Sequence, residues 1–174
     1  MKNKKIVFFL LTALALTGLG VNSCKKDSSG NVQMFLTHGS WQLASVLVIN
    51  YLGTSQVGTT DTLNTNCDST QLFTLNTNNT CTYTNFECIP QKSSGSWSLS
   101  NNQLLLRSNM MCADTLKGGI SDPNKVQPFI NTQIINCGQY SLVIQTGDIN
   151  VFVTSTTRRR IVQYGFVHQI TNTQ

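Results

Sequence analysis

Short strand-like runs separated by turn residues are the feature that most constrains the fold of this chain. Asn, Ser and Thr together supply 56 of the 174 residues. Thr and Val suit pleated strands and Asn suits turns, so this composition favours β-structure with polar loops. No run of about 12 residues shows helical periodicity, apart from a weak turn at 32–36. The sequence therefore predicts an all-β domain.

The expected strands occupy nine runs, with an uncertainty of one in either direction. Hairpins are expected around 77–79 and around Asn101 and Asn102, because Asn tolerates a positive φ. Many short strands at even spacing favour a barrel or a sandwich. The polar stretch 111–126 is expected to be a long connection. The nine runs are 40–50, 70–76, 80–88, 95–100, 103–108, 129–136, 140–145, 150–156 and 160–170.

The first residues have the pattern of a secretory leader. Three lysines within the first five residues precede an apolar run over 6–16, and two glycines interrupt the chain before Cys24. A basic start, a short apolar centre and small residues before a cleavage site are typical of a signal peptide. The 16 residues from Ile6 to Val21 are fewer than the roughly 20 that a membrane-spanning helix needs. We therefore predict that residues 1–23 are removed.

The residues Val21-Asn22-Ser23-Cys24 resemble the lipobox of bacterial lipoproteins, although Asn22 departs from the small residue usual at its place. The resemblance implies that Cys24 carries palmitate-type acyl chains, that 24–35 is a polar tether and that 36–174 is the folded domain. Two or three acyl chains suffice for stable anchoring. The same resemblance implies that Lys25 after the Cys favours delivery to the outer membrane, and both the periplasmic and the surface face stay open as locations. The alternative is ordinary signal cleavage with an unlipidated Cys24.

The basic character of the chain belongs largely to its leader. The full chain has 12 basic and 7 acidic residues, and its formal charge is +5. Removal of the leader takes away three lysines and leaves a charge of +2 over 151 residues. The charge therefore does not indicate a nucleic-acid partner.

A sequence of strand motifs over residues 36–108 resembles the lipocalin-like domains of bacterial lipoproteins. The resemblance implies an up-and-down β-barrel of about eight or nine strands, and it supports the fold more than the function. The C-terminal strands fit the family by pattern only. The motifs are Gly39-Ser40-Trp41, Cys67-Asp68, Phe73, the polar turn 76–79, Tyr83, Cys88 and Gly95-Ser96-Trp97-Ser98-Leu99.

Five cysteines remain if Cys24 is lipidated, so at most two disulfides can form. With Thr77 and Asn78 as the turn of the first hairpin, Cys67 and Cys88 fall directly opposite each other, and a three-residue turn displaces Cys88 by one. Cross-strand neighbours lie about 5 Å apart, within disulfide reach. We predict a Cys67–Cys88 disulfide. Two small buried thiols are the alternative, and the pairing of the other cysteines stays open.

Catalytic and metal-binding patterns are scarce in the sequence. His38 and His168 are the only imidazoles, and neither the histidines nor the cysteines have zinc-ligand spacing. The chain has no nucleophile-elbow, zincin or phosphate-loop motif. We expect neither an enzyme nor a metal or cofactor.

Strand alternation and barrel closure place Trp41 beside His168. The first and last strands of an up-and-down barrel pair antiparallel, so the start of one meets the end of the other. Lipocalins lay an Arg of the last strand over the Trp, whereas this chain has His168 there. We predict that the two rings form the plug of one barrel end, the alternative being that His168 is an ordinary polar residue. The expected inward faces are Trp41, Leu43, Ser45, Leu47 and Ile49, and Val162, Tyr164, Phe166, His168 and Ile170.

Three adjacent arginines begin the last strand and should lie at the opposite rim. Arg158 and Arg160 share parity with Val162 and should lean inward, while Arg159 faces out. An anionic head group could dock at such a mouth, although a solvated turn is the alternative. The candidates for the wall of the mouth, each of which could instead be plain core, are Tyr140, Phe152, Tyr164 and Phe166.

These observations leave two functions open. The first is a membrane-anchored lipocalin-like lipoprotein of the cell envelope that carries a small apolar or anionic-headed ligand. The second is a collapsed barrel that acts as a non-catalytic interaction or envelope-structural module, with an unknown protein partner. An enclosed apolar cavity above roughly 300 Å³ would favour the carrier.

Overall fold

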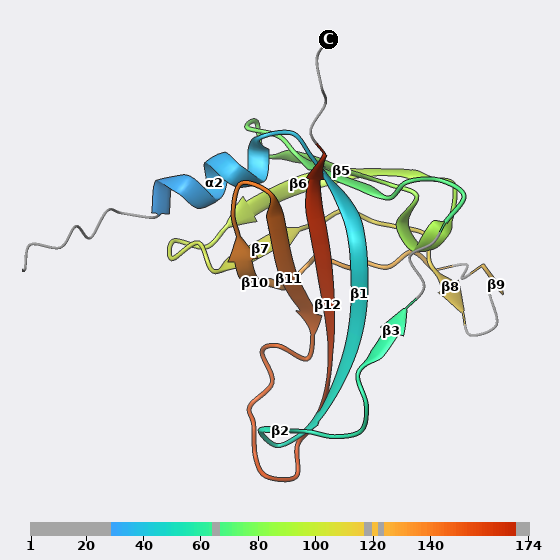
Figure 1. The fold of residues 1–174 in the computed structure, drawn as a ribbon, viewed down its shortest axis with the longest axis vertical. Helices are drawn as coiled ribbons and strands as arrows, with labels where there is room; N and C mark the ends of the chain where they lie inside the picture. Colours follow the sequence, from blue (N-terminus) through green and yellow to red (C-terminus); the bar gives the residue numbers. More distant parts are fainter. Residues whose placement is uncertain (1–28, 64–66, 117–119, 122–123, 170–174) are drawn as a thin grey trace, which may run out of the picture.

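The computed structural model describes residues 29–63, 67–116, 120–121 and 124–169. Eight antiparallel strands form a closed up-and-down barrel in the order β12-β11-β10-β7-β6-β5-β4-β1, and β1 pairs with β12 to close it (Figure 1). The predicted fold class is confirmed. The barrel strands are β1 (Ser40–Leu52), β4 (Leu72–Leu75), β5 (Thr80–Thr84), β6 (Lys92–Leu99), β7 (Leu105–Ser108), β10 (Thr132–Cys137), β11 (Ser141–Gly147) and β12 (Arg158–Gln169).

Several shorter elements lie outside the eight barrel strands. The strands β2 (Ser55–Gln56) and β3 (Asp61–Leu63) pair with β1, and β8 (Thr115–Leu116) pairs with β9 (Ile120–Ser121) inside the predicted long connection. The described helices are α2 (Ser29–Thr37) and the 3-10 turn η1 (Phe86–Cys88).

The two longest strands project beyond the barrel as a ribbon. β1 and β12 stay paired from Ser40↔Gln169 at one end to Leu52↔Arg158 at the other. β4 pairs with β1 only over Ser40–Gln42, and β11 stops pairing with β12 at Ile161. The far end of the ribbon is therefore flanked only by short strands and loops, and Figure 1 shows it extending away from the other strands.

A β-bulge in β1 corrects one expectation about side-chain direction. The register with β12 shifts between Leu43 and Ser45, which leaves Ala44 as an extra residue. An extra residue inverts the alternation after it. Trp41 and Leu43 face the interior as expected, but beyond the bulge Val46 and Val48 are the buried residues of β1. The expected inward places of Ser45, Leu47 and Ile49 were therefore wrong.

The expected strand at 150–156 was also wrong. After Gly147 the chain forms a loop whose backbone bonds are local, from Ile149 N–H to the Gly147 carbonyl and from Thr157 N–H to the Thr154 carbonyl. The Thr157 hydroxyl accepts a further bond from Thr154 N–H at 2.9 Å. Local side-chain and backbone bonds of this kind compete with strand pairing.

Helix α2 covers one end of the barrel. It begins inside the segment expected to be a bare tether and extends the weak turn expected at 32–36. Leu36 is fully buried, and its carbonyl accepts a hydrogen bond from Trp41 Nε1–H at 3.1 Å. The ribbon end lies at the opposite pole of the molecule (Figure 1). No helix among the described residues is both long enough and apolar enough to cross a membrane.

Candidate binding surface at the ribbon end

Aromatic side chains fill the interior of the barrel. Phe129 lies at the centre of the cluster, and its ring centroid is 5.0 Å from that of Phe73, 5.7 Å from Tyr83, 5.4 Å from Tyr164 and 6.2 Å from Phe86. Offset and edge-to-face pairs at such distances stabilise a packed core beyond the area they bury. Tyr164 and Phe166, which were expected to line a ligand mouth, are buried members of this core.

The end of the barrel next to α2 is plugged by Trp41 and His168. The two residues are directly opposed across the β1–β12 seam, and their ring centroids lie 5.1 Å apart in a T-shaped arrangement. His168 Nε2 is also in hydrogen-bond contact with the His38 carbonyl. The ring therefore links the last strand to the turn that follows α2. Ile170, expected on the same face, lies outside the described residues.

The arginines predicted at the opposite rim line a surface pocket of about 410 Å³. Arg158 and Arg160 are exposed, and on β12 they share parity with the buried Val162 and Tyr164. Arg160 also lies close enough to lower the pKa of Tyr164, which burial raises. The lining residues lie on the far ends of β1 and β12 and on the loops beside them, so the pocket is formed by the ribbon and not by the barrel interior. Its lining residues are Asn50, Tyr51, Leu52, Val57, Asp148, Arg158, Arg159 and Arg160.

Arg159 connects the last strand to the turn after β1 at this end. Its guanidinium carbon lies 5.0 Å from the centroid of the Tyr51 ring, and its Nη2 donates to the Gly53 carbonyl at 3.1 Å. The Gly53 N–H donates to the Thr157 carbonyl at 2.8 Å. These contacts hold the turn after β1 against the loop before β12, so the tip of the ribbon is an ordered surface.

Apolar side chains are exposed on the two loops at this tip. Phe152 is 85 % exposed, and Leu52, Val57 and Val151 are exposed as well. Large apolar residues gathered at one exposed place mark interaction sites more often than apolar residues scattered singly. Phe152 was expected in a pocket wall, and that placement was wrong because its loop is not a strand of the barrel.

Tyr140, the remaining candidate for the mouth, lies at the other end of the molecule. It is 62 % exposed, and its carbonyl accepts a bond from His168 N–H at 3.0 Å. It therefore belongs to the end that carries the Trp41 plug. Tyr140 directly precedes β11, whose first residue pairs with Val167 near the plugged end, so its expected place at the mouth was wrong.

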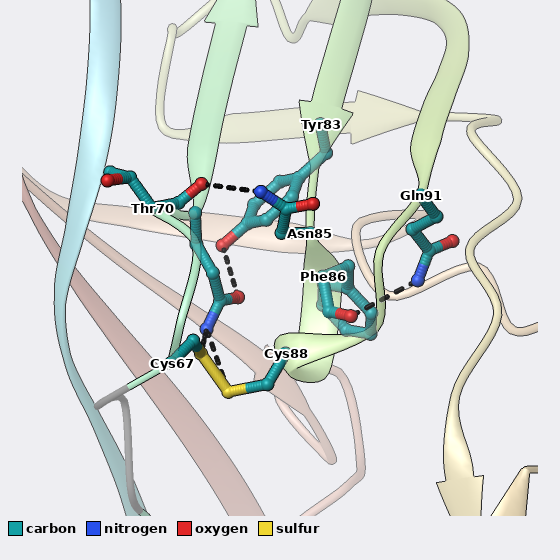
Figure 2. The surroundings of a disulfide bond; sticks show 8 residues. Cys67, Thr70, Tyr83, Asn85, Phe86, Cys88 and Gln91 are labelled. Atoms are coloured by element: carbon teal, nitrogen blue, oxygen red, sulfur yellow. Dashed lines mark hydrogen bonds between the residues drawn. A yellow bond between two sulfur atoms is a disulfide. The ribbon is translucent and has the colours of Figure 1, made fainter.

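The predicted disulfide between Cys67 and Cys88 is present, with a Cα–Cα distance of 5.3 Å (Figure 2). The hairpin argument was only partly right, because paired residues of β4 and β5 end at Leu72↔Thr84. Beyond that pair, η1 turns Cys88 back toward Cys67. Gln71 Nε2 donates to Cys67 Sγ at 3.3 Å, and Tyr83 Oη donates to Gln71 Oε1 at 3.3 Å. The disulfide is therefore joined to the aromatic core.

The turn at η1 contains three residues in the left-handed region, which are Asn85 (φ 59°), Glu87 (φ 51°) and Cys88 (φ 60°). Two contacts hold it: Asn85 Nδ2 donates to the Thr70 carbonyl at 2.9 Å, and Gln91 Nε2 donates to the Phe86 carbonyl at 3.1 Å (Figure 2). Burial raises the pKa of the Glu87 carboxyl, nearby Asp114 raises it further, and Arg160 opposes the shift.

Three cysteines of the described chain are free thiols, namely Cys81, Cys112 and Cys137. Burial raises the pKa of each, in the case of Cys137 to about 11. Cys81 Sγ lies 3.1 Å from Ser108 Oγ. Thiols in such surroundings are poor nucleophiles. Among the described residues there is no group of three or more His, Cys, Asp and Glu side chains that could hold a metal ion.

In comparisons with known proteins, no family model, no curated protein and no solved structure matches the chain.

Sequence reasoning missed the residues that organise the two loops and the disulfide. Gln71 and Arg159 act through contacts between distant segments, so no local pattern could have revealed them. The apolar tip was detectable in part, because Val151 and Phe152 adjoin a turn-rich stretch that ends in three arginines.

Proposed function

We propose that this protein is a lipid-anchored, non-catalytic lipocalin-like lipoprotein of the cell envelope whose collapsed barrel binds its partner with the outer surface. The observation that carries the proposal is the filled interior: Phe73, Tyr83, Phe129 and Phe166 occupy the space that a carrier would leave to its ligand. The lipocalin-like motifs and the closed barrel support the fold on which the proposal rests.

The lipid anchor rests on the leader pattern and on Cys24, which lie outside the described residues. The described chain begins at α2, at the pole opposite the ribbon end (Figure 1). An anchor at Cys24 therefore holds the plugged end toward its own membrane and presents the arginine pocket on the far side. We propose the outer membrane as the location, with no preference between its two faces.

Binding of a small ligand is the second candidate function, and the pocket of about 410 Å³ beside Arg158 and Arg160 is the observation that favours it. Its volume falls within the range of small-molecule sites. It is formed on the ribbon outside the barrel, so such a ligand would be held by arginines at the surface and not by the apolar interior.

Intact-mass measurement of the full protein purified from its own membrane tests the proposal. The expected result is the mass of the chain from Cys24 with its acyl groups, and, under native conditions, no small molecule bound in a one-to-one ratio. The Cys24→Ser variant should lose metabolic palmitate labelling. A stoichiometric small molecule would contradict the collapsed-barrel proposal, and an unlipidated mass would contradict the anchor.

A further inference from the structure

We propose that the tip of the ribbon docks onto an anionic lipid bilayer, which is a second bilayer facing the membrane that holds the anchor. The tip is defined here as the two loops 53–57 and 148–157 together with Leu52 and the three arginines 158–160. The inference rests on the proposed function to the extent that the outer surface of the barrel makes the contact, and it names the partner of that surface.

The apolar part of the tip is suited to the boundary between head groups and acyl chains. Phe152 is almost entirely exposed to solvent, and its neighbour Val151 on the same loop is exposed as well. Leu52 and Val57 are exposed on the facing turn. Aromatic and aliphatic side chains on a protruding element bind a bilayer in proportion to the apolar area that they bury in its interface.

The charged part of the tip is positive and therefore complements an anionic bilayer. Arg158, Arg159 and Arg160 line the same pocket as Leu52 and Val57, and Asp148 is the acidic residue of that lining. The Asp148 carboxylate accepts a hydrogen bond from the Arg160 backbone N–H at 2.9 Å, and its one negative charge against three arginines leaves the pocket lining positive. A guanidinium donates two parallel hydrogen bonds to a phosphate oxygen pair. Exposed Arg158 and Arg160, which flank the pocket, are therefore placed to bind lipid phosphates.

The size of the tip suits a bilayer better than a protein partner. A standard protein interface takes about 20–30 residues from each partner. The whole tip has 19 residues, namely the 15 of the loops 53–57 and 148–157, Leu52 and the three arginines, and Gly53 among them is buried. A bilayer needs no complementary shape, and each basic residue near an anionic surface adds to the affinity independently.

The ribbon also supplies the rigidity that the docking requires. Arg159 ties the first loop to β12 through Tyr51 and the Gly53 carbonyl. Leu52 and Arg158 are a cross-strand pair, so an apolar and a basic side chain are fixed next to each other at the last paired position of the seam. Phe152 and the arginines can thus reach one surface without reordering the backbone.

Vesicle capture by the full chain tests the proposal. The protein is held on beads by a C-terminal tag, because β12 ends beside Ser40 at the pole away from the tip. After detergent is washed away, fluorescent vesicles of phosphatidylcholine alone, or of phosphatidylcholine and phosphatidylglycerol in equal amounts, are added. Every protein in the test carries Cys24→Ser, so that acyl chains at Cys24 cannot capture vesicles. The test variant is Phe152→Ser with Arg158→Gln. The matched control is Tyr140→Ser with Arg107→Gln, which removes an exposed aromatic ring and an exposed arginine elsewhere.

The wild type and the control variant should capture the phosphatidylglycerol vesicles equally, and the tip variant should capture them about tenfold less. Capture should fall as salt is added, because the arginine contribution is screened. All three proteins should melt at the same temperature, since the replaced side chains are exposed. Equal capture by the tip and control variants, or equal capture of neutral and anionic vesicles, overturns the proposal.

A protein from the native membrane that cross-links to position 152, with no vesicle capture, would also overturn the lipid assignment but would leave the collapsed-barrel function standing. A stoichiometric small ligand in the native mass would contradict the collapsed-barrel function. The vesicle capture would then still decide the lipid proposal.

Discussion

Trp41 and His168 face each other across the seam that closes the barrel, with their ring centroids 5.1 Å apart. Trp41 also reaches the covering helix, because its Nε1–H donates to the Leu36 carbonyl. One fully buried side chain therefore joins the first strand, the last strand and α2.

Replacing Trp41 by Phe should destabilise the protein by about 1–3 kcal/mol, because the Leu36 carbonyl then loses its donor in a buried place. Urea unfolding monitored by circular dichroism measures the loss. Trp97→Phe is the matched control: the Trp97 Nε1–H donates to the Asn76 carbonyl at 3.0 Å in a part-buried place, so its loss should cost less. An equal cost for the two variants would contradict the role assigned to Trp41.

Gly147 and Gly165 should differ in their tolerance of Ala. A Cβ at Gly147 would lie 2.4 Å from the Arg160 carbonyl oxygen, and the residue has φ +90°. Gly147→Ala should therefore cost about 1–3 kcal/mol in backbone strain. At Gly165 the close atom is the Ser45 hydroxyl, at 2.5 Å.

The Gly165→Ala loss should be smaller, because the Ser45 side chain can rotate away, and Ser45→Ala should recover most of it. Thermal unfolding of the three single variants and of the Gly165→Ala/Ser45→Ala double variant measures these differences. If the double variant is no more stable than Gly165→Ala alone, the bulge does not place Ser45 against Gly165.

Loss of the Cys67–Cys88 disulfide should cost about 3 kcal/mol, as expected for closing a loop over a sequence separation of 21 residues. Cys67→Ser/Cys88→Ser should lower the melting temperature, and reductant should lower that of the wild type but not that of the double variant. Cys137→Ser is the control, because Cys137 is a free thiol. A reductant effect that persists in the double variant would show that a different pair is bridged.

Glu87 should make stability fall as pH rises. Burial, assisted by Asp114, raises the pKa of its carboxyl in the folded protein. Folding then favours the protonated form, so the contribution is fully present below the pKa of the unfolded chain and is lost as pH rises through the folded pKa.

Glu87→Gln should therefore melt higher than the wild type at neutral pH, and the difference should vanish in acid below the usual carboxyl range. Melting curves across the acidic range measure it, with exposed Asp61→Asn as the control. A neutral-pH melting temperature below that of the wild type would show that the Glu87 charge stabilises the fold.

The strand pattern was predictable because it is local. Alternation and turn residues located most of the barrel strands, and the antiparallel seam followed from closing the barrel, which placed Trp41 opposite His168. The disulfide was predictable for a related reason, since a hairpin brings its two flanks together whichever turn it adopts. The Cys24 anchor lies outside the described residues and stays a prediction.

The wrong predictions concern features that the local residue pattern does not contain. The bulge at Ala44 inverted the alternation of β1, and nothing in the run from Ser40 to Asn50 marks an extra residue. The loop with Phe152 has strand-like residues but satisfies its own backbone locally. Whether inward rings enclose a void or touch one another depends on the barrel radius, which the sequence pattern does not contain.

The most direct test of the filled interior is a titration of the protein with a benzene-sized apolar probe. NMR chemical shifts of the core residues report the binding. The wild type should show no saturable binding, whereas Phe129→Ala should bind one probe, because removal of the central ring leaves an apolar cavity of the kind that takes benzene. Phe129→Leu serves as the second variant should Phe129→Ala prove too unstable to fold, and it should bind the probe weakly. Saturable binding of one probe molecule inside the wild-type barrel would contradict the account.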